Sequence, residues 1–147
     1  MTCFRPGSRP HFFYRLHPWR GRKGEKKTIA WTEYRDLIVL THHQLHSPLV
    51  WVWDNLNVHL TSELATFITE NKQWLTVFRL PSYAPELNPV EGVWSLLKRS
   101  LENFAAVGLD HLVAVSRRKL KKIQYRPDLI GGCLAGTGLS IETPSPS

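Results

Sequence analysis

The chain has 147 residues, of which 42% are hydrophobic and 21% charged, so it is long enough to bury one core and has the composition of a soluble globular domain. Its longest apolar runs, such as residues 49–53, have the size of a strand, which excludes a membrane span, and its first residues lack the apolar segment of a secretory signal. Cys3 and Cys133 lie far apart and show no ligand spacing, which excludes a disulfide framework or a zinc site and indicates reduced thiols in a cytosolic protein.

The charge is unbalanced. A net charge of +7 and a pI near 9.7 indicate an anionic partner, and nucleic acid is the commonest choice. Residues 1–30 hold eight Lys or Arg against one acid, and residues 117–126 hold six against none. A plain solvated basic surface is the alternative interpretation of these blocks.

The apolar spacing predicts strands that alternate with helices. In chain order the expected elements are a strand at 10–17 with 1–4 as a possible partner, a basic loop at 19–27, a helix at 31–45, a buried central strand at 49–53, a helix at 61–71, a strand at 75–80, helices at 89–104 and 110–123, and a disordered tail at 141–147. This alternation is typical of an α/β domain. Without internal repeats or an interior linker, residues 1–140 are expected to form one domain.

Asp54 directly follows the predicted strand 49–53. A carboxylate at the carboxyl end of a central strand lies where α/β proteins place their ligands. The alternative is a turn, because Asp54 and Asn55 are good turn residues.

Glu91 lies at the start of the helix that follows Asn88 and Pro89. With Asn88 as N-cap, Glu91 takes the third helical position, where a capping-box glutamate bonds back to the N-cap N–H. The helix also has a polar face on which Glu91, Ser95 and Lys98 line up, a pattern that favours a divalent metal beside a phosphate. The opposite, buried stripe is expected to contain Val90, Val93, Trp94, Leu97 and Leu101.

Transfer of a phosphodiester needs a nucleophilic oxygen, a leaving oxygen and charge neutralisation. Two hard cations held by oxygen ligands supply all three, and magnesium or manganese prefers Asp and Glu to Cys and His. One carboxylate at a strand end and another on a nearby helix are ligands that such a site requires.

Four strings carry a family resemblance: VWDN at 52–55, LTVFRLP at 75–81, YAPELNPVE at 83–91 and VWSLLKR at 93–99. Together they resemble the catalytic domain of DDE-type transposases, in the bacterial insertion-sequence branch related to mariner elements. The spacing from Asp54 to Glu91, 91 − 54 = 37 residues, is similar to that between the second and third acids of the family. The resemblance extends from about residue 10 to residue 139.

The resemblance implies a ribonuclease H-like fold, a mixed sheet flanked by helices. It implies that Asp54 and Glu91 bind two Mg²⁺ or Mn²⁺ ions, one activating water or a 3′-hydroxyl and the other stabilising the leaving oxygen. Lys98 is then expected to contact a phosphate, although a surface lysine is the alternative. Tyr83 and Asn88 are expected to shape the loop beside the metals. His59 is interpreted as a helix-start residue, and Trp53 and Trp94 as core residues.

The sequence departs from the family pattern at the first acid, which belongs on a strand well before residue 10. The acids that precede Asp54 are Glu25 in the basic loop and Glu33 and Asp36 in a predicted helix. The helix-turn-helix modules of the family are also missing. The chain is therefore expected to be an amino-terminally truncated catalytic domain that needs its first acid from elsewhere.

The implied partners are transposon-end and target DNA, together with a second copy of the chain or a complementing amino-terminal segment, in the bacterial cytoplasm without a membrane. The basic residues expected to grip the DNA backbone are Arg20, Arg22, Lys23, Lys26 and Lys27 in the loop and Arg118, Lys121 and Lys122 on the last helix. Two alternatives remain: a non-catalytic DNA-binding or dimerising remnant, and a ribonuclease H-like nuclease acting on RNA or on hybrids.

Overall fold

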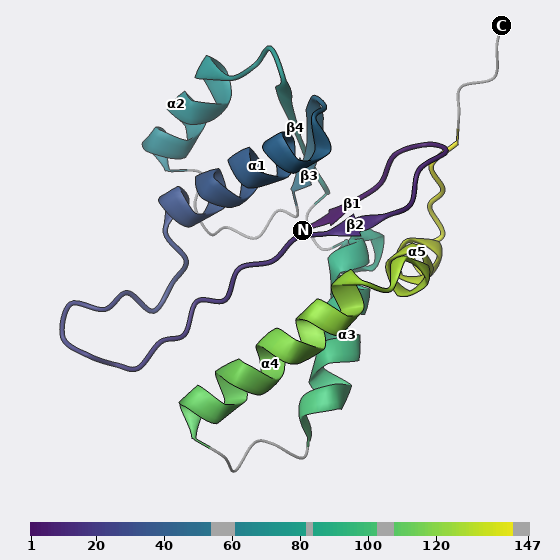
Figure 1. The fold of residues 1–147 in the computed structure, drawn as a ribbon. Helices are drawn as coiled ribbons and strands as arrows, with labels where there is room; N and C mark the ends of the chain where they lie inside the picture. The colour runs from purple at the N-terminus through teal and green to yellow at the C-terminus, as the bar shows by residue number, and fades with distance from the viewer. Residues whose placement is uncertain (54–60, 82–83, 103–107, 143–147) are drawn as a thin grey trace, which may run out of the picture. The chain divides into compact units, whose positions relative to one another are not determined.

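A computed structural model describes residues 1–53, 61–81, 84–102 and 108–142. The chain forms two compact units. Unit 1 contains Met1–Pro18 together with Pro85–Ser147, and unit 2 contains Trp19–Ala84. The secondary structure is mixed α/β, with five α-helices and two small sheets in the described part of the chain (Figure 1).

Unit 2 is a small two-layer α/β arrangement. Its elements are α1 (Trp31–Leu45), β3 (Leu49–Trp53), α2 (Ser62–Glu70) and β4 (Leu75–Arg79). The two strands pair in parallel, from Leu49 opposite Leu75 to Trp53 opposite Arg79. Parallel strands need a crossover connection, and α2 provides it here. Thr61 starts this helix as its N-cap, because the Thr61 hydroxyl accepts the N–H of Leu64 at 3.2 Å.

One face of the β3–β4 sheet is packed and the other is exposed. Trp53 and Leu75 on the packed face are 9% and 1% exposed, whereas Val50, Val52 and Phe78 on the other face are 54–66% exposed. The prediction of a buried central strand at 49–53 was therefore wrong for Val50 and Val52, two of its five residues, while Leu49 and Trp51 are half-buried. Successive side chains of a strand point to opposite faces, so Val50 and Val52 lie on the face opposite to Trp53.

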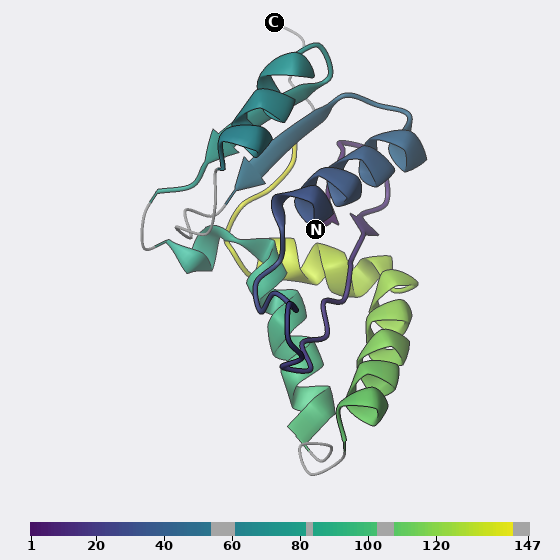
Figure 2. The ribbon, with the colours of Figure 1, turned by 90° about the vertical axis from the view of Figure 1, so that its left-hand side faces the viewer.

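Unit 1 joins a short hairpin to three helices. Its elements are β1 (Thr2–Cys3), β2 (His11–Phe12), the 3₁₀ turn η1 (Pro85–Leu87), α3 (Pro89–Leu101), α4 (Leu109–Gln124) and α5 (Pro127–Ala135). The two strands pair antiparallel, with Thr2 opposite Phe12. Residues 1–4 were expected as a possible partner of a strand at 10–17, and each strand is only two residues long. Helices α3 and α4 lie side by side and α5 runs across them (Figures 1 and 2).

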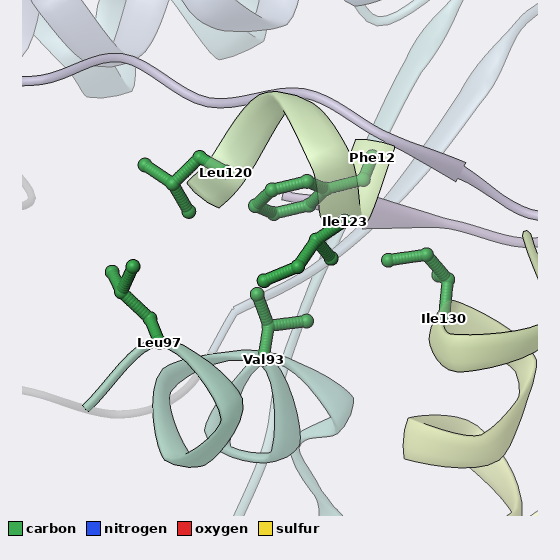
Figure 3. Close-up of a cluster of buried hydrophobic side chains, with 6 residues drawn as sticks. All are labelled: Phe12, Val93, Leu97, Leu120, Ile123 and Ile130. Carbon is green, nitrogen blue, oxygen red and sulfur yellow. The ribbon is translucent and has the colours of Figure 1, made fainter. Parts of the chain in front are cut away.

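The core of unit 1 is a single hydrophobic cluster. It draws side chains from β2, α3, α4 and α5 (Figure 3), namely Phe12, Val93, Leu97, Leu120, Ile123 and Ile130. The side-chain amide of Gln124 also donates to the Phe12 carbonyl at 2.8 Å, which ties the last turn of α4 to β2. Helix α5 meets α3 at Gly92, where an added Cβ would lie 2.8 Å from the Cys133 sulfur.

Two expectations about the core had different outcomes. Trp53 is buried as predicted, but Trp94 is 44% exposed and lies outside the core. Consecutive helical residues point about 100° apart. Because α3 turns Val93 and Leu97 inward, its neighbour Trp94 is turned toward the solvent.

Candidate functional site

The first turn of α3 is fixed by Asn88. Its side-chain oxygen accepts the N–H of Val90 at 3.1 Å, and Pro89 occupies the first helical position. The Asn88 N–H donates to the Pro85 carbonyl at 3.0 Å, which joins the helix to η1. The predicted N-cap is confirmed, and the same residue sets how the preceding loop enters the helix.

Glu91 lies in this first turn with an exposed side chain. Its backbone N–H donates to the Asn88 carbonyl at 3.1 Å, but its carboxylate makes no hydrogen bond or ion pair with any residue that the structure describes. A capping box would need the Asn88 N–H, which donates to Pro85 instead. The helix end is therefore capped without the Glu91 side chain.

The polar face of α3 continues from Glu91 through Ser95 to Lys98, and all three side chains are exposed. The Ser95 hydroxyl donates to the Glu91 carbonyl at 3.0 Å. Seven residues separate Glu91 from Lys98, which corresponds to about 10 Å of helix axis. The Glu91 carboxylate and the Lys98 ammonium group are therefore carried by the same exposed face of α3.

The other predicted carboxylate, Asp54, lies outside the described residues, as do Tyr83 and His59. The strand that leads to Asp54 is described. The Trp53 carbonyl accepts the N–H of Leu80 at 2.7 Å, so β3 and β4 end together at one edge of their sheet. In α/β sheets this carboxyl edge is where ligands bind.

Arg79 is a candidate residue that the sequence reasoning missed. It pairs with Trp53 in the strand register and its side chain is exposed, so it places a cation at the edge from which Asp54 continues. The sequence signal for this role was that Arg79 is the charged residue of the predicted strand 75–80 and lies near its end, just before Pro81. Such a cation suits a site that binds a phosphodiester.

The backbone of the basic loop at 19–27 is held by the side chain of Glu25, which lies within the loop. The Glu25 carboxylate accepts the backbone N–H groups of Arg22 at 3.1 Å and Arg20 at 2.8 Å. These two hydrogen bonds lower the pKa of Glu25. The Lys27 ammonium lies 5.2 Å from the centre of the Trp19 ring, within cation–π distance.

The side chains of Arg22, Lys23 and Lys26 in this loop are exposed, as are those of Lys121 and Lys122 on α4. They belong to different units, the first three to unit 2 and the last two to unit 1. All five predicted DNA-contacting residues of this set are thus accessible to a ligand.

The three acids before Asp54 are each engaged locally. Glu25 accepts the two loop N–H groups, Glu33 accepts the N–H of Ala30 at 2.8 Å at the start of α1, and Asp36 pairs with Arg35 at 2.8 Å. Among the residues that the structure describes, no three His, Cys, Asp or Glu side chains gather into a metal-binding group.

Comparison with known families gives one match. Residues 24–109 match the sequence model of the family described as DDE superfamily endonuclease, a range that includes both Asp54 and Glu91. Comparisons with curated proteins and with solved structures found no match. No helix in the described part of the chain is long and apolar enough to cross a membrane.

Proposed function

This chain belongs to the DDE superfamily endonuclease family, and on that basis we propose that it is the carboxyl-terminal part of a transposase catalytic domain. A nuclease domain of this type implies DNA as the substrate. The proposed reaction is cleavage of a DNA strand followed by its transfer to a target. We assign the domain to residues 1–140, to a ribonuclease H-like fold and to the insertion-sequence branch that its motifs resemble.

The observation that carries this proposal is the unused carboxylate of Glu91. A glutamate at the third position of a helix ordinarily bonds to the N-cap N–H, but here that group donates to Pro85. The carboxylate is left exposed at the helix end, with no partner among the described residues. An exposed, ionisable oxygen ligand on a rigid helix fits a hard divalent cation.

We assign Asp54 and Glu91 as the ligands of Mg²⁺ or Mn²⁺. Bound metal would neutralise charge on the phosphodiester and activate the attacking oxygen. Lys98 would contact a phosphate from the same face of α3, while Asn88 and Tyr83 would shape the loop before the helix. Asn88 supports this role through its hydrogen bonds to Val90 and Pro85.

The remaining acid of the site is proposed to come from another segment or from a second copy of the chain. Glu25, Glu33 and Asp36 each hold local N–H groups or an arginine, so using one of them as a ligand would break those interactions. A complementing amino-terminal segment is the simplest source.

The test is strand cleavage of a supercoiled plasmid by the purified chain, with and without a separately supplied amino-terminal segment, in Mg²⁺ or EDTA. Asp54→Asn and Glu91→Gln are expected to abolish Mg²⁺-dependent nicking. The matched control is Glu102→Gln, which neutralises an exposed carboxylate at the far end of α3. Equal nicking by Glu91→Gln and Glu102→Gln would contradict the metal assignment.

The second candidate function is a non-catalytic DNA-binding or dimerising remnant. The cations exposed on α4 favour it, because they suit DNA binding and need no metal. Binding of duplex DNA without nicking under any combination of metal and added segment would establish this alternative in place of the enzyme.

A further inference from the structure

We propose that the exposed face of α4 formed by Arg117, Arg118, Lys121, Lys122 and Tyr125, here called the α4 basic face, binds the phosphate backbone of duplex DNA. This proposal rests on the proposed function for the choice of DNA as partner. It assigns a DNA-binding surface that is separate from the proposed metal ligands, and binding to this surface requires no metal.

The rotation of α4 is fixed by its buried side. Val115, Leu120 and Ile123 are 4%, 1% and 7% exposed, and the last two belong to the core cluster of unit 1. Gln124 bonds to the Phe12 carbonyl and holds the end of the helix against β2. The cations of the run 117–122 are therefore carried by a helix anchored to the core, with four of them exposed and Lys119 half-buried.

These cations have no acidic partner among the described residues. No ion pair or hydrogen bond of their side chains joins Arg117, Arg118, Lys119, Lys121 or Lys122 to a described carboxylate. Pairs such as Arg117 with Lys121 and Arg118 with Lys122 stand four residues apart, where like charges repel and destabilise a helix. The arrangement therefore works against the folded chain unless an anion is bound.

A structural explanation accounts for only part of this charge. Cations in the last turn of a helix interact favourably with its dipole, which is equivalent to about half an elementary charge. Lys121 and Lys122 lie in the last turn of α4, so the helix dipole accounts for these two cations. Arg117, Arg118 and Lys119 lie further from the helix end, where the effect has fallen off, and they point to an external anion.

Tyr125 adds a neutral hydrogen-bond donor to the α4 basic face. It follows the last residue of α4 and is 72% exposed, beside Lys121 and Lys122 on the preceding turn. Arginine, lysine and tyrosine side chains all donate hydrogen bonds to DNA phosphates. The run from Arg117 to Tyr125 covers about 12 Å of helix axis, which matches roughly seven charges along a duplex.

The test measures duplex binding by fluorescence anisotropy in EDTA from 50 to 200 mM KCl. The variant is Arg118→Gln/Lys122→Gln, and the control is Arg9→Gln/Lys72→Gln, which removes the same charge from exposed positions elsewhere. Loss of two phosphate contacts should reduce the steepness of log K against log salt by about 1.8. Raising the KCl concentration from 50 to 200 mM should therefore weaken DNA binding by the variant by a factor that is about twelvefold smaller than the factor for wild type.

The control should keep the wild-type slope, and the charge-preserving variant Arg118→Lys/Lys122→Arg should bind nearly as wild type. Equal slopes for the variant and the control would overturn the proposal, and tighter binding of single-stranded than of duplex DNA would overturn the choice of partner. EDTA excludes metal-dependent chemistry, so failure of the cleavage test would leave this outcome unaffected. Thermal melts by circular dichroism verify that each variant is folded.

Discussion

Cys3 is a half-buried thiol whose ionisation is opposed by the fold. Burial raises its pKa from 9.0 to about 11, because the charged thiolate loses its hydration. Burial also raises the pKa of Cys133. Neither thiol is in a setting that activates a nucleophile, and both are free thiols rather than a disulfide.

This shift predicts a loss of stability in alkaline solution. Between pH 9 and pH 11 the unfolded chain releases the Cys3 proton while the folded chain keeps it, so the free energy of unfolding falls as the pH rises. Below about pH 8 this thiol has no effect. Urea denaturation at pH 8, 9, 10 and 11 should show a shallower decline for Cys3→Ala than for wild type. Parallel curves for the two proteins would show that the thiol ionises equally in both states.

Features of single residues were predictable from the sequence where a local rule decides the outcome. Asn88 was predicted as an N-cap because its position before Pro89 is sufficient to identify it. Trp94 was predicted as a core residue but is exposed. The predicted apolar stripe of α3 contains five residues, whereas the helix fully buries only two of them, Val93 and Leu97. The freedom of the Glu91 carboxylate was also beyond prediction, since it depends on Pro85 taking the Asn88 N–H.

Helices α3 and α5 are in close contact at Gly92. A Cβ there would lie 2.8 Å from the sulfur, 3.0 Å from the Cβ and 3.4 Å from the Cα of Cys133. Glycine is unfavourable in a helix interior, so its presence here reflects the space that α5 leaves. The two helices are thereby held close beside the turn that carries Glu91.

We expect Gly92→Ala to destabilise the protein by about 1–2 kcal/mol, because overpacking costs about 1–3 kcal/mol and outweighs a gain in helix propensity of up to about 1 kcal/mol. The control is Gly132→Ala in α5, where a Cβ meets nothing within 4 Å and stability should rise. Urea denaturation measures both changes. Adding Cys133→Ala should recover part of the loss, and a Gly92→Ala protein as stable as wild type would refute the close contact.

The elements themselves were predicted unevenly. The bounds of α1 and β3 agree with the predicted ranges 31–45 and 49–53 residue for residue, because apolar spacing and Pro48 mark both. Helix α5 was missed, although Pro127 at its first position was a start signal. Two consecutive glycines in a nine-residue helix weaken the pattern, and α5 is held instead by Ile130 in the core.

Unit 1 is assembled from distant parts of the sequence, residues 1–18 and 85–147. Phe12 from β2 is 4% exposed and shares its core with residues of α3, α4 and α5 (Figure 3). Local sequence patterns carry no information about such a pairing. The sequence therefore indicated an α/β chain but not the division into two units.

Phe12→Ala is expected to cost about 3–5 kcal/mol, since it opens a cavity among three helices. The matched control is Phe78→Ala, whose side chain is 59% exposed on β4 and should change stability by about 0.5 kcal/mol or less. Circular dichroism during urea titration reports the loss of helix. Similar midpoints for the two variants would contradict a core that depends on β2.

The same discontinuity sets an order of events during synthesis. Residues 19–84 are synthesised before α3, α4 and α5, so the whole of unit 2 has been made while unit 1 still lacks its helices. The bond between Phe12 and Gln124 spans 112 residues, which take about 6–22 seconds to translate at typical rates of roughly 5–20 residues per second. During those seconds the Phe12 ring lacks the helices that bury it in unit 1, and once it has left the ribosome it is open to water and to any apolar surface that captures nascent chains.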